Sequence, residues 1–178
     1  MQINSHQIYY ALEDRLLNLL SLSSFLAVKA EFEAEGTRID ELALLSELCC
    51  KNKIPLTLKI GGPSAQRDIY EAFQLGAKNI LVPMVESKYS LLKCVELFNK
   101  FDPLFKNLTN MPKLFINIES KLALKNCDSI IETIIKEKLP VSSLVIGRTD
   151  LAASLGINNI EDDSILFIAK DLIQKNSN

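Results

Sequence analysis

The feature of this sequence that most constrains its fold is a repeated alternation of short apolar segments with helix-length segments. Such alternation is typical of an α/β fold with a parallel sheet, because parallel strands need long crossover connections. The segments predicted as strands are residues 26–32, 55–60, 79–85, 114–118 and 144–147. The predicted helices cover about residues 5–20, 38–52, 64–75, 89–98, 122–138 and 163–175.

Three of these strands have one apolar face and one polar or charged face, which distinguishes between two parallel arrangements. The polar positions are Lys29, Glu31, Glu33, Thr57, Lys59, Asn117 and Glu119. Central strands of an open doubly wound sheet are apolar on both faces. In a barrel, the apolar faces pack outward on the helices and the polar faces converge inside. The sequence therefore predicts a parallel (β/α) TIM-barrel-type fold. A solvated face of an antiparallel sheet is the alternative.

The length of the chain predicts that this barrel is incomplete. A full eight-stranded barrel takes about 250 residues, whereas this chain has 178 residues and about five to six strands. We expect residues 1–178 to form a single partial TIM-barrel domain. Its two sheet edges would be exposed, so we expect a homo-oligomer or a partner that covers them.

Charge and cysteine content argue against several classes of function. The net charge is −2 and no basic stripe occurs, which argues against nucleic-acid binding. The apolar stretch 16–28 is too short to span a membrane. The four cysteines contain no CxxC pair, so we expect reduced thiols in a cytoplasmic protein and no zinc site.

The carboxyl ends of the last two predicted strands suggest a metal site. Glu119 ends one strand and Asp150 follows the next. Two carboxylates on neighbouring strand ends can chelate Mg²⁺ or Mn²⁺. Such an ion can polarise a carbonyl group and stabilise an enolate.

Nearby cations and glycines suggest how a small anionic substrate is held. Lys59, Lys29 and Arg148 can hold a substrate carboxylate. Gly61 and Gly62 precede a helix and can present N–H groups to an anion, although a tight turn is an equal alternative. Structural pairing of the glutamates with the lysines inside the barrel is an alternative to a functional role.

Three stretches, "LVPMVES", "INIESKLALKNCDSI" and "VIGRTDLAASLG", together resemble the HpcH/HpaI aldolase and citrate lyase β-subunit family of the phosphoenolpyruvate/pyruvate TIM-barrel group. The resemblance implies a divalent-metal-dependent carbon–carbon lyase that acts on a small keto acid or acyl substrate through a metal-stabilised enolate. Glu119 and Asp150 match the metal carboxylates, and Lys59 lies near the position of the substrate-carboxylate arginine. Asn117 stands where the aldolases usually have glutamine.

The sequence departs from this family in its acid/base residues. The early acidic motif, which carries a histidine in the aldolases, contains only glutamates here, so Glu33 or a metal-bound water would have to serve. Arg148 stands where many aldolases have proline. We therefore predict Lys59, Arg148 and Glu33 as catalytic residues, and Lys29, Gly61, Gly62 and Asn117 as substrate-binding residues. The alternative function is a truncated, catalytically silent relative that serves as a binding or assembly module.

Overall fold

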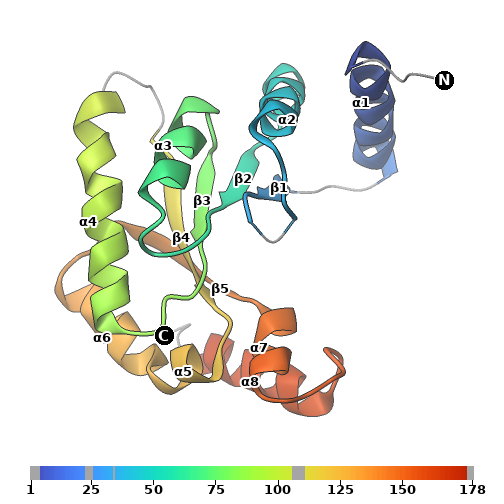
Figure 1. Ribbon diagram of the computed structural model, residues 1–178. Coiled ribbons are helices and arrows are strands. Elements are labelled where there is room, and N and C mark those ends of the chain that lie inside the picture. The colour runs from blue at the N-terminus through green and yellow to red at the C-terminus, as the bar shows by residue number, and fades with distance from the viewer. Residues whose placement is uncertain (1–4, 23–25, 34, 106–110, 176–178) are drawn as a thin grey trace.

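The computed structural model describes residues 5–22, 26–33, 35–105 and 111–175, and its strands form one parallel sheet (Figure 1). The strands are β1 (Val28–Glu31), β2 (Leu56–Lys59), β3 (Asn79–Val82), β4 (Lys113–Ile118) and β5 (Val141–Ile146). They lie in the order β1-β2-β3-β4-β5, and each neighbouring pair is parallel. The predicted parallel α/β fold is therefore confirmed.

A helix follows each strand, as the alternating pattern predicts. The helices are α1 (Ser5–Leu22), α2 (Ile39–Lys51), α3 (Gln66–Gln74), α4 (Lys88–Phe105), α5 (Lys121–Lys125), α6 (Cys127–Lys136), α7 (Arg148–Ser154) and α8 (Asp163–Lys175). The single helix predicted over residues 122–138 is instead two helices, α5 and α6, that meet at Asn126. The Asn126 side chain donates a hydrogen bond to the carbonyl oxygen of Glu86 at 2.8 Å, which ties this break to the loop after β3.

The two faces of the sheet differ in polarity as a barrel requires. Leu58, Ile80 and Ile116 lie on the face that packs into the apolar core, and each is fully buried. On the opposite face the strand register aligns Glu31 with Lys59, and Asn79 donates a hydrogen bond to Thr57 at 2.8 Å. The apolar face therefore packs on the helices and the polar face lines the inside of the curved sheet.

Helix α1 lies apart from the sheet and contacts α2 (Figure 1). Glu13 forms an ion pair with Lys51 at 2.6 Å, and the Lys51 ammonium lies 5.8 Å from the centre of the Tyr9 ring. Leu17, Leu19 and Leu22 of α1 are exposed, whereas Leu16 and Leu20 pack against the apolar core. In the part of the chain that the structure describes, none of the helices combines the length and the hydropathy that a transmembrane span requires.

The four cysteines are free thiols, as predicted. Cys49, Cys94 and Cys127 are buried and Cys50 is exposed. Burial raises the pKa of Cys94 to about 12, which keeps this thiol protonated and unreactive at neutral pH.

Candidate functional site

A cavity of about 490 Å³ lies at the carboxyl ends of the strands. Its charged lining residues are Glu31, Glu33, Lys59, Glu119 and Asp150. Carboxylates outnumber ammonium groups four to one on this wall. The cavity therefore attracts cations, and the position of Lys59 decides how its charges are balanced.

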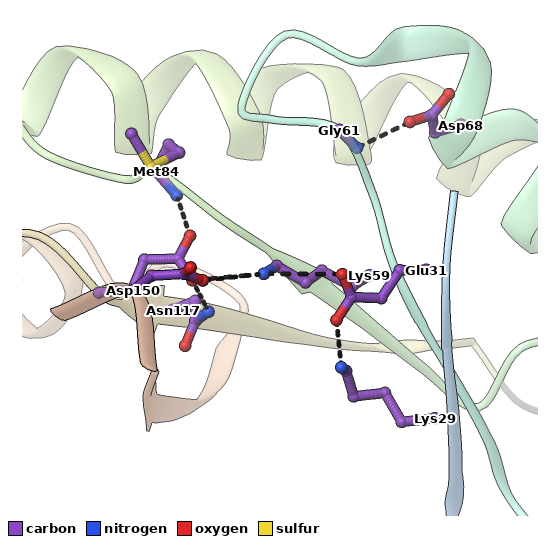
Figure 2. A network of polar contacts seen from close by, with 9 residues as sticks. Lys29, Glu31, Lys59, Gly61, Asp68, Met84, Asn117 and Asp150 are labelled. Carbon is purple, nitrogen blue, oxygen red and sulfur yellow. Dashed lines mark hydrogen bonds and ion pairs between the residues drawn. The ribbon is translucent and has the colours of Figure 1, made fainter. Parts of the chain in front are cut away.

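The Lys59 ammonium lies among three of these carboxylates (Figure 2). Its Nζ is 3.4 Å from Glu119, 3.5 Å from Asp150 and 3.9 Å from Glu31. Burial lowers the pKa of Lys59, but these three carboxylates raise it by more, so the pKa lies above its usual value. Lys59 is therefore a firmly protonated cation at the convergence point of β1, β2, β4 and α7.

Glu119 is buried at the end of β4 and is held from two sides. One carboxylate oxygen accepts a hydrogen bond from the backbone N–H of Met84 at 3.1 Å. The other accepts from the side-chain amide of Asn117 as well as from Lys59. Burial raises the pKa of Glu119, the Lys59 charge opposes this, and the neighbouring Asp150 carboxylate raises it further. The net result is a pKa above the usual value for glutamate.

Two backbone features that sequence analysis did not identify fix the direction of Glu119. Met84 has a φ of 56°, in the left-handed region that is unfavourable for a residue with a side chain, and this conformation accompanies the N–H contact to Glu119. Gly147, directly after β5, faces the side chain of Glu119. A Cβ atom at Gly147 would lie 2.8 Å from the Cβ of Glu119 and 3.0 Å from the Asn117 amide nitrogen.

Two serines join the loops that carry the site. Ser120 is the N-cap residue of α5, and its side chain accepts a hydrogen bond from the backbone N–H of Ala123 at 3.1 Å. Ser154 in α7 accepts a hydrogen bond from the N–H of Lys121 at 2.9 Å. The contact of Ser154 attaches α7, and with it Asp150, to the segment that follows Glu119.

Several predicted residues lie away from the central cluster. Lys29 is half-exposed on the edge strand β1 and pairs with Glu31. The Arg148 guanidinium pairs with Glu161 at 3.3 Å and does not line the cavity, so a contact with substrate would require it to leave that pair. Helix α7 begins at Arg148, and this places Asp150, rather than Arg148, toward Lys59.

The β1–α2 and β2–α3 turns also differ from expectation. Strand β1 ends at Glu31, so Glu33 is an exposed loop residue rather than a strand residue, although its side chain lines the cavity. The N–H of Gly61 donates a hydrogen bond to Asp68 at 2.7 Å and is not free for a ligand (Figure 2). Space around Gly62 is open, since no atom lies within 4 Å of a Cβ built there.

The donor set suits a hard divalent cation. Glu119 and Asp150 already share one positive group, the Lys59 ammonium, at 3.4 and 3.5 Å. Mg²⁺ is usually bound by one or two protein carboxylates, with water and substrate in the other positions. The side-chain oxygen of Asn117, next to Glu119, is buried without a hydrogen-bond partner. Within the described ranges, no group of three or more His, Cys, Asp or Glu side chains forms a metal cage.

Comparisons with known proteins agree with this fold. The sequence profile of the HpcH/HpaI aldolase/citrate lyase family matches residues 59–177. A crystal structure of an HpcH/HpaI aldolase/citrate lyase family protein from Burkholderia cenocepacia J2315 superposes with a TM-score of 0.71 and 15% identity over 90% of this chain and 70% of that one. No curated protein sequence matches the chain significantly.

Two further solved structures are similar. The citrate synthase SbnG has a TM-score of 0.73 and 19% identity, over 90% of this chain and 67% of that one. Macrophomate synthase has a TM-score of 0.65 and 14% identity, over 92% of this chain and 65% of that one. The chain therefore spans about two thirds of the length of these structures, and the similarity is one of fold.

Proposed function

Because this chain belongs to the HpcH/HpaI aldolase/citrate lyase family, we propose that it is a divalent-metal-dependent carbon–carbon lyase. Its substrate would be a small keto acid or acyl compound. The observation that carries this proposal is the approach of Glu119 and Asp150, from different elements, to the same cationic group at 3.4 and 3.5 Å. Carboxylates that share one cation in a cavity of about 490 Å³ can hold a metal ion beside a small acid.

We assign Glu119 and Asp150 as the residues that would hold Mg²⁺ or Mn²⁺. A divalent cation there would polarise the keto group of the substrate and stabilise negative charge on its oxygen. The excess of carboxylates over ammonium groups on the cavity wall supports a cation at this place.

Lys59 would bind the carboxylate of the substrate. Its pKa lies above the usual value, so the ammonium form persists at neutral pH. A protonated lysine cannot attack a carbonyl carbon, which argues against a Schiff-base aldolase mechanism. A substrate carboxylate would take the place next to Lys59 that Glu119 and Asp150 share when no substrate is present.

Glu33 would serve as the acid/base residue for aldol cleavage. Its exposed carboxylate would accept the proton of a hydroxyl group on the fourth carbon of the substrate. The electron pair of that O–H bond becomes the new carbonyl bond, and the bond between the third and fourth carbons breaks. Its electrons form the enolate of the keto-acid half, and the other half leaves as an aldehyde. The proton on Glu33 then returns to the third carbon.

Exchange of the methyl protons of pyruvate tests this proposal directly. In deuterated buffer with Mg²⁺, we expect the protein to introduce deuterium into the pyruvate methyl group, measured by proton NMR. The exchange should stop when the metal is removed. A folded protein that shows no exchange at high concentration would contradict the proposal.

The same assay addresses the second candidate, a catalytically silent binding or assembly module. The specific observation in its favour is that Arg148 pairs with Glu161 rather than facing the cavity. A silent module would bind pyruvate without exchanging its methyl protons, whereas a lyase would bind pyruvate and exchange them.

We also propose that the chain is cytoplasmic and self-associates. In the part of the chain that the structure describes, β1 and β5 each pair with a strand on one side only. Open edges of this kind favour association. Light scattering should therefore report a mass above that of the 19.9 kDa chain at high concentration, and a monomer would contradict this expectation.

A further inference from the structure

The turn between β2 and α3 is held by a carboxylate to which the proposed reaction assigns no role. The backbone N–H of Gly61 donates a hydrogen bond to Asp68 at 2.7 Å (Figure 2). Asp68 is the third residue of α3, a position from which a side chain can reach back to the N–H of the helix N-cap residue. Here the N-cap residue is Ala65, and its N–H donates instead to the carbonyl oxygen of Gly62 at 3.1 Å. The side chain of Asp68 therefore holds the turn rather than the start of its own helix.

Gly61 is also the surface on which the carboxyl group of Glu33 lies. A Cβ atom at Gly61 would overlap that carboxyl group, so the contact is possible because Gly61 has no side chain. The N–H of Phe32 donates to the carbonyl oxygen of Lys59 at 3.1 Å, which anchors the backbone beside Glu33 to β2. Among the residues whose positions the structure gives, none donates a hydrogen bond to the Glu33 carboxylate or forms an ion pair with it. The direction of this carboxylate in the cavity therefore depends on where Gly61 lies.

The hydrogen bond to Asp68 also occupies a donor beside Glu33. The amide nitrogen of Gly61 is one covalent bond from the Cα atom on which the Glu33 carboxyl group lies. Without Asp68, this N–H would be available to the Glu33 carboxylate. A carboxylate that accepts a hydrogen bond is stabilised in its ionised form and is a weaker base. Asp68 therefore leaves Gly61 with neither a side chain nor a free N–H to offer Glu33.

We propose that Asp68 is a positioning residue for Glu33, the acid/base residue of the proposed reaction. By accepting the N–H of Gly61, Asp68 fixes the turn that directs the Glu33 carboxylate into the cavity, and it keeps that carboxylate available to a proton. Asp68 does not itself line the cavity. The inference rests on the proposed function and adds to it a residue outside the cavity on which proton transfer depends.

Exchange of the pyruvate methyl protons reports on Glu33, because the proposed reaction returns the proton of Glu33 to the third carbon, which is the methyl carbon of pyruvate. In deuterated buffer with Mg²⁺, Asp68→Ala should lower the exchange rate about tenfold, since a small displacement of a catalytic group is enough for such a loss. Calorimetry should show parental affinities for pyruvate and Mg²⁺. Asp68→Asn should retain most of the exchange rate, because its side-chain oxygen can still accept the N–H of Gly61.

Gly61→Ala tests the same contact from the other side. The added Cβ would displace only the end of the flexible Glu33 side chain, and the φ of Gly61 is not positive, so thermal unfolding should show nearly parental stability. The exchange rate should nevertheless fall at least as far as in Asp68→Ala. The matched control is Arg67→Ala, which removes the 2.8 Å ion pair with Glu71 from the same helix and should leave the exchange rate unchanged.

Three results in a parent protein that exchanges would show that this inference is wrong while the proposed function stands. Asp68→Ala could exchange at the parental rate, it could lose pyruvate affinity to the same extent as exchange, or Asp68→Asn could lose as much exchange as Asp68→Ala. If the folded parent protein does not exchange the methyl protons at all, the proposed function falls and the inference with it.

Discussion

Glu119→Ala is expected to abolish Mg²⁺ binding, measured by calorimetry, and Asp150→Ala is expected to do the same. Loss of residues that only support metal ligands usually costs about 10–100-fold in affinity, so loss of a ligand should cost at least about 100-fold. Glu119 should be the more sensitive position, because it is buried whereas the side chain of Asp150 is 58% exposed. Water can replace an exposed ligand more easily than a buried one.

Glu31→Gln is the matched control for these variants. Glu31 lines the same cavity and lies 3.9 Å from Lys59, but we assign it no metal contact. Its loss should change the Mg²⁺ affinity only a few-fold, through the lower charge of the cavity. Unchanged binding in both alanine variants would refute the assigned ligands.

Because the pKa of Glu119 is raised, Mg²⁺ affinity and folding stability should depend on pH in opposite directions. Metal binding needs the ionised carboxylate, so the Mg²⁺ affinity should fall as the pH decreases through the raised pKa. The folded state favours protonated Glu119, and this stabilisation is complete below the usual value of 4.5 and is lost as the pH rises through the folded-state pKa. The side chain introduced by Glu119→Gln cannot ionise, so this variant should not lose stability as the pH rises. The free energy of unfolding in urea, measured from pH 4 to 7 for the parent and the variant, would test this.

Among residues to which we assign no contact with metal or substrate, Gly147 is expected to give the most damaging variant when it is changed to alanine. The added Cβ would lie 2.8 Å from the Cβ of Glu119, an atom close to the backbone that cannot simply rotate away. The φ of Gly147 is −81°, which alanine can adopt, so the cost is steric rather than conformational. Overpacking of this kind costs about 1–3 kcal/mol of unfolding free energy, and the displaced Glu119 should lose Mg²⁺ affinity as well.

Gly62→Ala provides the comparison for this variant. It makes the same chemical change near the same cavity, but no atom lies within 4 Å of the added Cβ. Thermal unfolding and calorimetry should therefore show nearly parental stability and Mg²⁺ affinity. Equal behaviour of the two glycine variants would show that the space beside Glu119 is not restricted.

Most of the fold could be predicted because it depends on local patterns. Alternation of Leu56, Leu58 and Ile60 with Thr57 and Lys59 is enough to assign a strand and its two faces. The boundaries were less accurate, because β1 ends two residues before Glu33 and the alternation does not show where a strand turns away from its partner.

The candidate site could be predicted only for residues whose charged side chains follow a predicted strand. Glu119, Asp150 and Lys59 follow from their places at strand ends, and the structure brings them together. Met84 could not be found, because its contribution is a backbone N–H in an unusual conformation and its side chain gives no signal. Arg148 was predicted at the site because its charge follows a strand, but its direction depends on Glu161, which lies in the later segment before α8.

The ammonium of Lys59 between Glu119 and Asp150 means that the site keeps a positive charge even without a metal ion. The two acids do not repel each other unchecked in the apoprotein, so the fold does not need the ion as a structural support. We therefore expect a chelator to remove the proposed metal-dependent activity without unfolding the chain.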